Sequence, residues 1–326
     1  MEIPIEKLGV VLTYACSMHK ICDYCYAKSF ANLYKEMDIA YFSRLLSWIK
    51  SIDKSCQELK ILGGEPTEYS QFSKAMELLN ETSINLSPKI VLYTHGCFDK
   101  KKLDILLQNE GIKQIAFHYD EGYLSHKNIF RRNFYRNIKE LSRFGREVFL
   151  RYNTNDLTSQ HGELFNLAAN INAPIIYSLS TPCVGCKSYT KIEDYADIIP
   201  HLRLFIDQAT RNGIKVKLSR PIPLCALSDE NSKDELIKLG GFRFECSPSP
   251  TVNPDGSILT CSVLFKWKSL RTKNAREFKS AIHDAIKRGD ALKYKQMIPQ
   301  KCKSCQYFIS KICQGGCLAY REAESQ

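Results

Sequence analysis

Three cysteines near the start of the chain are the residues most able to do chemistry. Cys16, Cys22 and Cys25 follow the spacing C-x5-C-x2-C. Thiolates so closely spaced are ligands for soft metals, and the two main possibilities are an iron–sulfur cluster and zinc. Three thiolates leave one position of a four-iron cluster open. The loop therefore predicts a reactive cluster, with a zinc site completed by His19 as the alternative.

A second group of cysteines lies in the C-terminal part of the chain. It has six members: Cys246, Cys261, Cys302, Cys305, Cys313 and Cys317. Clusters whose four positions are all filled by thiolates are inert or relay electrons. The sequence therefore predicts a metalloenzyme with one working cluster and one or more supporting clusters, and a structural zinc knuckle is the alternative for the last four of these cysteines.

Composition limits the class of protein. The chain has 326 residues, of which 44% are hydrophobic and 25% charged, which is typical of a folded globular protein. The first fourteen residues show no basic segment before a long apolar stretch, and no apolar run reaches eighteen residues, so neither a signal peptide nor a membrane span is predicted. Fourteen cysteines in such a chain favour metal binding over disulfides, and we expect a cytoplasmic protein.

The formal net charge is +11. Such a charge is typical of a solvated basic surface, and it also favours an acidic partner such as a peptide. The basic residues are spread along the chain and no nucleic-acid-binding motif is present, so no nucleic-acid partner is predicted.

The elements that must position the cysteines alternate between strand-like and helix-like runs up to residue 219. Short apolar runs separated by amphipathic segments predict an α/β fold with a parallel sheet covered by helices, and six or seven such units suit a partial TIM-type barrel, (β/α)6. The predicted strands are 8–14, 59–62, 90–93, 114–117, 148–152, 175–179 and 215–218, and the predicted helices are 37–52, 72–80, 101–108, 134–144, 162–169 and 192–211. Ligands of such folds collect at the carboxyl ends of the strands, where the first cysteine loop follows the first strand.

The pattern changes after residue 219. Prolines interrupt every long element, cysteines become frequent, and 274–294 is the one clear helix. The sequence therefore predicts two domains, 1–219 and 220–326.

The turn Gly63-Gly64-Glu65-Pro66 follows the second predicted strand. Two residues without Cβ let the backbone approach a ligand closely. Together with the cysteine loop, this turn resembles the radical S-adenosylmethionine (radical SAM) superfamily, whose members carry C-x3-C-x2-C and GGEP. The resemblance implies a four-iron cluster that binds S-adenosylmethionine and, once reduced by a flavodoxin or ferredoxin, cleaves it to a 5′-deoxyadenosyl radical. Two extra residues separate the first two cysteines here.

The resemblance also implies cofactor-binding residues. Besides the GGEP turn these are Tyr24 inside the cysteine loop, Thr94 and Asn153. Thr94-His95-Gly96 is similar to the family's TNG turn, and Asn153 and Asn155 stand where ribose contacts are expected. Asp120-Glu121-Gly122 is similar to the family's S-x-D-G, with His118 in the serine position. No catalytic side chain is assigned.

The C-terminal cysteines resemble the SPASM auxiliary-cluster domain. Its opening matches Cys246-x9-Gly256-x4-Cys261, and its second half is similar to C-x2-C-x7-C-x3-C from Cys302 to Cys317. The resemblance implies one auxiliary cluster on Cys246, Cys261 and Cys317, with Cys225 as the candidate fourth ligand, and a second that starts on Cys302, Cys305 and Cys313.

The last ligand of that second cluster is left open. A non-cysteine ligand, an open position, and Cys183 or Cys186 are the alternatives, and the last two cysteines could instead form a redox pair. Cys56 and Cys97 are expected to be packing residues.

A SPASM domain behind a radical SAM core resembles enzymes that mature peptides and proteins. The resemblance implies that a ribosomally made peptide is modified by a cross-link, a thioether, an epimerisation or an oxidation. A radical SAM enzyme acting on a small metabolite, and a non-catalytic iron–sulfur or zinc protein, are the alternatives.

Overall fold

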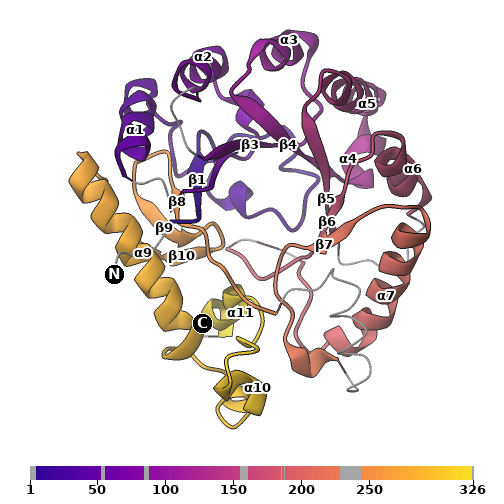
Figure 1. Ribbon diagram of the computed structural model, residues 1–326, viewed down its shortest axis with the longest axis vertical. Coiled ribbons are helices and arrows are strands. Elements are labelled where there is room, and N and C mark those ends of the chain that lie inside the picture. The colour runs from indigo at the N-terminus through magenta and orange to yellow at the C-terminus, as the bar shows by residue number, and fades with distance from the viewer. Residues whose placement is uncertain are drawn as a thin grey trace. The chain divides into compact units, whose positions relative to one another are not determined.

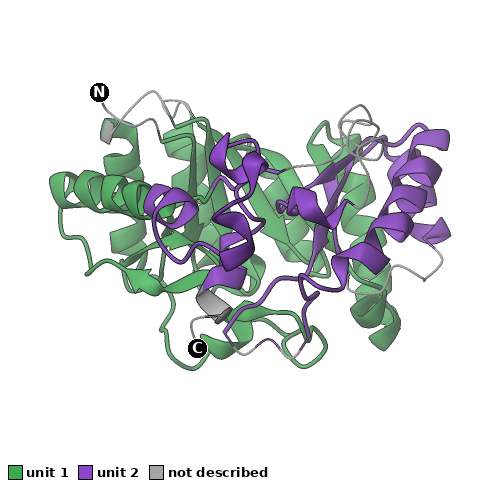
Figure 2. Cartoon of the chain, turned by 90° about the horizontal axis from the view of Figure 1, so that it is seen from below, with its two compact units in different colours: residues 1–148, 248–289 green, residues 149–247, 290–326 purple. Residues whose placement is uncertain are grey.

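The computed structural model describes residues 5–52, 56–83, 88–154, 161–184, 186, 188–227 and 244–324. Packing divides the chain into two compact units, each made of two stretches of sequence (Figure 2). Unit 1 comprises residues 1–148 and 248–289, and unit 2 comprises 149–247 and 290–326.

The sheet of unit 1 has the strand order β10-β9-β8-β1-β2-β3-β4. Strands β1 to β4 are parallel, β8 pairs parallel with the other edge of β1, and β9 and β10 continue antiparallel. The strands are β1 (Lys7–Val11), β2 (Glu58–Leu62), β3 (Lys89–Thr94), β4 (Ile112–Tyr119), β8 (Thr251–Val252), β9 (Ile258–Cys261) and β10 (Leu264–Lys268).

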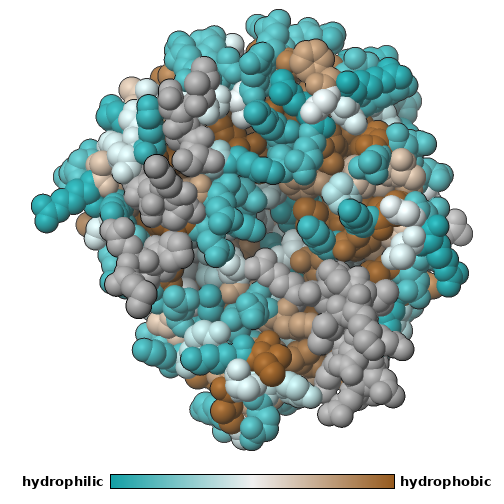
Figure 3. Space-filling model, viewed as in Figure 1, coloured by the Kyte–Doolittle hydropathy of each residue, from teal (hydrophilic) through white to brown (hydrophobic). Residues whose placement is uncertain are grey.

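Helices cover the outer side of this sheet in unit 1 (Figure 1). They are α1 (Ile39–Ile52), α2 (Phe72–Ser83), α3 (Lys100–Gln108) and α5 (Asn128–Arg143), whereas the short α4 (Glu121–His126) lies closer to the strands. Every residue of β1 after its first is buried, as expected for a strand covered on both faces. The outward faces of α2, α3 and α5, along the top of Figure 3, are mostly hydrophilic, so their apolar sides supply the core.

Unit 2 contains three parallel strands among its described residues. They are β5 (Glu147–Thr154), which begins just before the boundary, β6 (Ile175–Leu179) and β7 (Val216–Leu218). Tyr152 and Tyr177 of these strands pack against Phe205, with ring centroids 6.0 and 5.2 Å away. The helices of this part are α6 (Gly162–Asn170), α7 (Tyr195–Arg211), α10 (Gln306–Ile309) and α11 (Leu318–Glu324).

One helix crosses from unit 1 to unit 2 in sequence: α9 (Ala275–Tyr294). Four short 3-10 helices among the described residues stand beside cysteines or the GGEP turn. They are η1 (Tyr26–Ser29), η2 (Pro66–Glu68), η3 (Leu224–Ala226) and η4 (Gln300–Cys302). None of the helices in the described part of the chain is both long and apolar enough to cross a bilayer.

The structure confirms the α/β fold class, and all seven predicted parallel strands are present. The strands β8 to β10 were not predicted. They place 248–289 in unit 1, so the two units do not coincide with the predicted ranges 1–219 and 220–326. The predicted division into a core domain and an auxiliary domain stays a prediction.

Candidate active site and metal centres

The GGEP turn is bonded to the backbone that leads into the first cysteine loop. The Gly64 N–H donates to Thr13 O and the Glu65 N–H to Ala15 O, both at 2.8 Å. A Cβ on Gly64 would lie 2.4 Å from Tyr14 O, and one on Gly63 would lie 2.8 Å from Thr13 O. Both positions therefore require glycine because the turn packs directly on residues 13–15.

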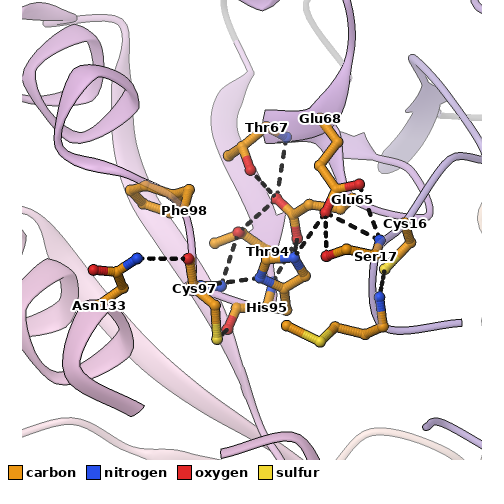
Figure 4. Close-up of polar contacts among 12 residues, drawn as sticks. Cys16, Ser17, Glu65, Thr67, Glu68, Thr94, His95, Cys97, Phe98 and Asn133 are labelled. Carbon is orange, nitrogen blue, oxygen red and sulfur yellow. Dashed lines mark hydrogen bonds and ion pairs between the residues drawn. The ribbon is translucent and has the colours of Figure 1, made fainter. Parts of the chain in front are cut away.

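The Glu65 carboxylate, fully buried, ties this turn to the end of β3 (Figure 4). It accepts hydrogen bonds from the Thr67 N–H (3.0 Å), the Thr67 hydroxyl (2.7 Å), the Thr94 hydroxyl (2.7 Å) and the His95 N–H (2.7 Å). The predicted cofactor residues Glu65 and Thr94 thus contact each other. With four donors already bound, this carboxylate holds two strand ends together.

Cys16, Glu68 and His95 bring three potential metal donors together. The Cys16 thiol, one Glu68 carboxylate oxygen and one His95 ring nitrogen all lie within 4.8 Å of one another. His95 Nδ1 accepts the Cys97 N–H at 2.9 Å, so the ring proton lies on Nε2, which is 3.3 Å from Glu68 Oε1. The histidine of this set is His95, whereas the zinc site predicted as an alternative from the sequence used His19. Burial lowers the pKa of His19.

The Glu68 carboxylate is held in its charged form. Burial works against that charge, but hydrogen bonds from His95 and from Ser17 outweigh it and lower the pKa of Glu68 to about 2. The Ser17 hydroxyl donates at 2.6 Å and its N–H at 2.9 Å. The residue after Cys16 is therefore fixed to the segment that follows the GGEP turn.

Cys22 and Cys25 complete the first loop. Cys25 directly precedes η1, and burial raises the pKa of its thiol, which the backbone of Lys28 and Ala27 opposes. Burial, together with nearby Asp120 and Cys25, raises the pKa of Cys22 to about 12. Cys25 is also among the groups that raise the pKa of Cys16, after burial and Glu65. The extra residues of the loop form turns between Cys16 and Cys22.

Tyr24 is anchored at the end of β4. Its hydroxyl lies 2.7 Å from His118 Nε2 and donates to Asp120. Asp120 also accepts the Gly122 N–H at 2.8 Å and so begins α4. The structure thereby joins Tyr24 to the segment that is similar to S-x-D-G.

Tyr123 is a candidate site residue that the sequence did not reveal. Its side chain is fully buried, and its hydroxyl has no hydrogen-bond partner among the described residues. Burial raises its pKa, and Cys97, Asp120 and Cys22 are the next causes. A buried polar atom normally has a partner, so this hydroxyl is available to a bound ligand.

In unit 2, Asn153 near the end of β5 also has a buried polar atom without a hydrogen-bond partner among the described residues, which is its side-chain oxygen. This fits the predicted ribose contact, which stays a prediction. Asn155 lies outside the described residues. Cys183 and Cys186 form a disulfide.

Cys225 lies near the second set of cysteines. The N–H of Leu224, the residue before it, donates to Cys313 Sγ at 3.5 Å, and burial followed by the thiols of Cys313 and Cys305 raises the pKa of Cys225. The two ligand sets that the resemblance implies stay predictions. Cys261 belongs to unit 1, at the end of β9.

Comparisons with known proteins agree with this geometry. Residues 10–164 match the family model of the radical SAM superfamily. The stretch contains the cysteine loop, the GGEP turn, Thr94, Tyr123 and Asn153, and the recognition of a radical SAM enzyme with a cysteine-rich C-terminal part is confirmed. No match was found among curated protein sequences.

Solved radical SAM structures share the fold. SuiB of Streptococcus suis bound to S-adenosylmethionine has a TM-score of 0.69 at 17% identity, over 99% of this chain and 74% of SuiB. SuiB bound to the precursor peptide SuiA has a TM-score of 0.70 at 17% identity, over 99% and 73%. The enzyme anSMEcpe with bound AdoMet has a TM-score of 0.64 at 20% identity, over 95% and 88%. This likeness confirms the predicted partial-barrel fold class.

Proposed function

We propose that this chain is a radical SAM enzyme that modifies a peptide. The observation that carries the proposal is the backbone bonding of the GGEP turn to residues 13–15, directly before the cysteine loop. These bonds hold the two sequence motifs of the family at one place in unit 1.

The radical SAM family implies a four-iron cluster and S-adenosylmethionine. When bound and reduced, they supply a 5′-deoxyadenosyl radical that abstracts hydrogen from an unactivated carbon. Cys16, Cys22 and Cys25 would hold the cluster. In unit 1, the Tyr123 hydroxyl, which has no partner among the described residues, offers a hydrogen bond to a polar group of the cofactor. Asn153 stays the residue for which the resemblance implies a ribose contact. The protein supplies orientation and excludes water.

A peptide substrate is supported by what the similar structures contain. SuiB has been solved with the precursor peptide SuiA, and anSMEcpe with the Cp18Cys peptide. The net charge of +11 would attract an acidic peptide. A flavodoxin or ferredoxin reductant and a cytoplasmic location, where thiols stay reduced, belong to the same proposal.

The proposal includes the division of labour along the chain. Residues 1–219 would carry the radical SAM core, and residues 220–326 would carry one or two auxiliary iron–sulfur clusters.

Cleavage of S-adenosylmethionine tests the core of the proposal. The anaerobically reconstituted protein with dithionite should release 5′-deoxyadenosine, and the Cys22→Ala/Cys25→Ala variant should release none. Cys56→Ala is the matched control, because this buried thiol donates a hydrogen bond to the Glu58 carbonyl and does not belong to the cysteine loop. Cleavage that persists in the double variant would show that these thiols do not hold the working cluster.

Co-expression tests the substrate. Each short open reading frame beside the gene is expressed with the enzyme, and the peptides are examined by mass spectrometry. Loss of two hydrogens indicates a cross-link or an oxidation, and deuterium uptake from solvent indicates epimerisation. Turnover of a small metabolite, with every neighbouring peptide unchanged, would reject the peptide proposal.

One observation favours a second candidate. Cys16, Glu68 and His95 offer sulfur, oxygen and nitrogen donors within 4.8 Å, which is a set that zinc accepts. A non-catalytic zinc protein is therefore the alternative. Zinc without sulfide in the purified protein, together with no cleavage of S-adenosylmethionine, would favour it over the enzyme.

A further inference from the structure

The turn that carries Cys225 is bound to the sulfur of Cys313. Leu224, the residue before Cys225, donates its N–H to Cys313 Sγ at 3.5 Å. The Gly315 N–H donates to the same sulfur at 3.3 Å. Backbone N–H groups that converge on a cysteine sulfur are typical of iron–sulfur ligands, whose potentials they tune.

Two glycines close the loop after Cys313 onto its neighbours. Gly315 and Gly316 have φ of +72° and +83°, which L side chains rarely adopt. A Cβ on Gly315 would lie 3.2 Å from Cys302 Sγ, and one on Gly316 would lie 3.2 Å from Cδ of Pro223. The loop therefore contacts both the Cys302 sulfur and the turn that leads to Cys225.

Backbone hydrogen bonds join Cys305 to the same group. The Cys305 N–H donates to Cys302 O at 3.2 Å, and the Cys313 N–H donates to Tyr307 O at 3.0 Å, within α10, which begins directly after Cys305.

A buried cation lies next to this group. Arg321 is only 2% exposed, and its guanidinium donates to the carbonyl oxygens of Leu292, Lys293 and Gln314. A Cβ on Gly315 would lie 3.2 Å from Arg321 Nη2 as well as from Cys302 Sγ, so the guanidinium lies near this sulfur. A four-iron cluster with four thiolates has a net negative charge, which a buried guanidinium compensates.

We infer that Cys225, Cys302, Cys305 and Cys313 are the four ligands of one auxiliary four-iron cluster, with Cys225 as the ligand that the sequence left open. The inference rests on the proposed function for the kind of metal and goes beyond it in the ligand set. With all four irons bound by thiolate, this cluster relays electrons and has no position for a substrate.

Thiol labelling of the reconstituted protein tests the assignment. Cys225 is exposed, so an unligated thiol there is alkylated readily by iodoacetamide under anaerobic conditions, as peptide mass spectrometry will show. Ligation should slow its labelling by a factor of about ten or more, because the thiolate is the nucleophile. Removal of iron by a chelator should restore the fast rate. Equal rates before and after chelation overturn the inference.

Two matched variants distinguish the clusters. Cys302→Ser/Cys305→Ser should expose Cys225 to labelling, whereas Cys246→Ser/Cys317→Ser should leave it protected. Protection that follows Cys246 and Cys317 would assign Cys225 to the other set and overturn the inference. If a double variant fails to fold, the single variants Cys305→Ser and Cys246→Ser provide the same comparison.

A second readout uses the cluster itself. In the variant that lacks the three thiols of the first loop, a further Cys225→Ser change should leave one iron without its thiolate, and mild oxidation should then give the EPR signal of a three-iron cluster. No such signal would contradict the assignment. Cleavage of S-adenosylmethionine is measured on the parent protein. If the parent protein cleaves S-adenosylmethionine while Cys225 is labelled fast, only this inference is rejected. If Cys225 is protected from labelling but no cleavage occurs, only the proposed function is rejected.

Discussion

Replacing Glu65 with glutamine tests the network that joins the GGEP turn to β3. The Thr67 N–H donates to one carboxylate oxygen and the His95 N–H to the other. A glutamine therefore turns its NH2 group toward one of these donors whichever way the amide lies. One buried N–H loses its acceptor, which costs about 1–3 kcal/mol, and the remaining bonds lose their charge, so we expect a total of about 2–4 kcal/mol.

Thermal unfolding of the metal-free chain, followed by circular dichroism, measures this loss. At about 2–4 °C per kcal/mol for a unit of this size, the Tm should fall by at least about 4 °C. Glu77→Gln is the control, since this exposed carboxylate only pairs with Lys74 at 3.0 Å and should change little. A Glu65→Gln shift as small as that of the control would refute the reasoning.

Three further changes test other parts of unit 1. Tyr123→Phe removes a buried hydroxyl that has no partner in the described structure, so the free energy of unfolding of the metal-free chain should rise by about 1 kcal/mol or more. Tyr41→Phe loses a hydrogen bond of 2.9 Å and should lower that free energy. A Tyr123→Phe variant less stable than Tyr41→Phe would contradict this prediction. The pKa of Glu68 is lowered from 4.5 to about 2, so the stabilisation by the charged carboxylate is complete above pH 4.5 and is lost as the pH falls toward 2. Between these pH values the Tm of the unaltered chain should therefore fall more steeply than that of Glu68→Gln. Parallel curves of Tm against pH would disprove this prediction. Gly64→Ala places a Cβ 2.4 Å from a carbonyl oxygen and should lower both Tm and S-adenosylmethionine affinity by calorimetry, while Gly162→Ala, with open space around it, should change neither.

The regular part of the fold was predictable because its signals are local. The buried runs of β2 and β3 alternate with amphipathic helices, and both periods are visible within a few residues. Strand β8 was not predictable, because two residues, Thr251 and Val252, contain no period. Its pairing with Gly9 and Val10 depends on chain segments that are far apart in sequence.

The candidate site shows the same limit. Cysteine spacing and GGEP identify the motifs, since these are read along the chain. The approach of Cys16 to Glu68 and His95 depends on tertiary packing, and so does the approach of the turn that carries Cys225 to Cys313. Close approach of the Gly64 backbone to a ligand stays a prediction, and the structure adds a second need for glycine, because the backbone of residues 14 and 15 occupies the space of a Cβ.

The pairing of β1 with β8 has a consequence for synthesis on the ribosome. Unit 1 needs both residues 1–148 and residues 248–289, so its sheet stays incomplete while all of 149–247 is being translated. At about 5–20 residues per second, the nascent chain waits roughly 7 to 28 seconds between residue 148 and residue 289. During that interval the apolar edge of β1 has no neighbour on the β8 side, and unpaired strand edges promote aggregation. Newly made chains should therefore depend on chaperones that shield this edge, and slower translation of 149–247 should lower the yield of folded protein.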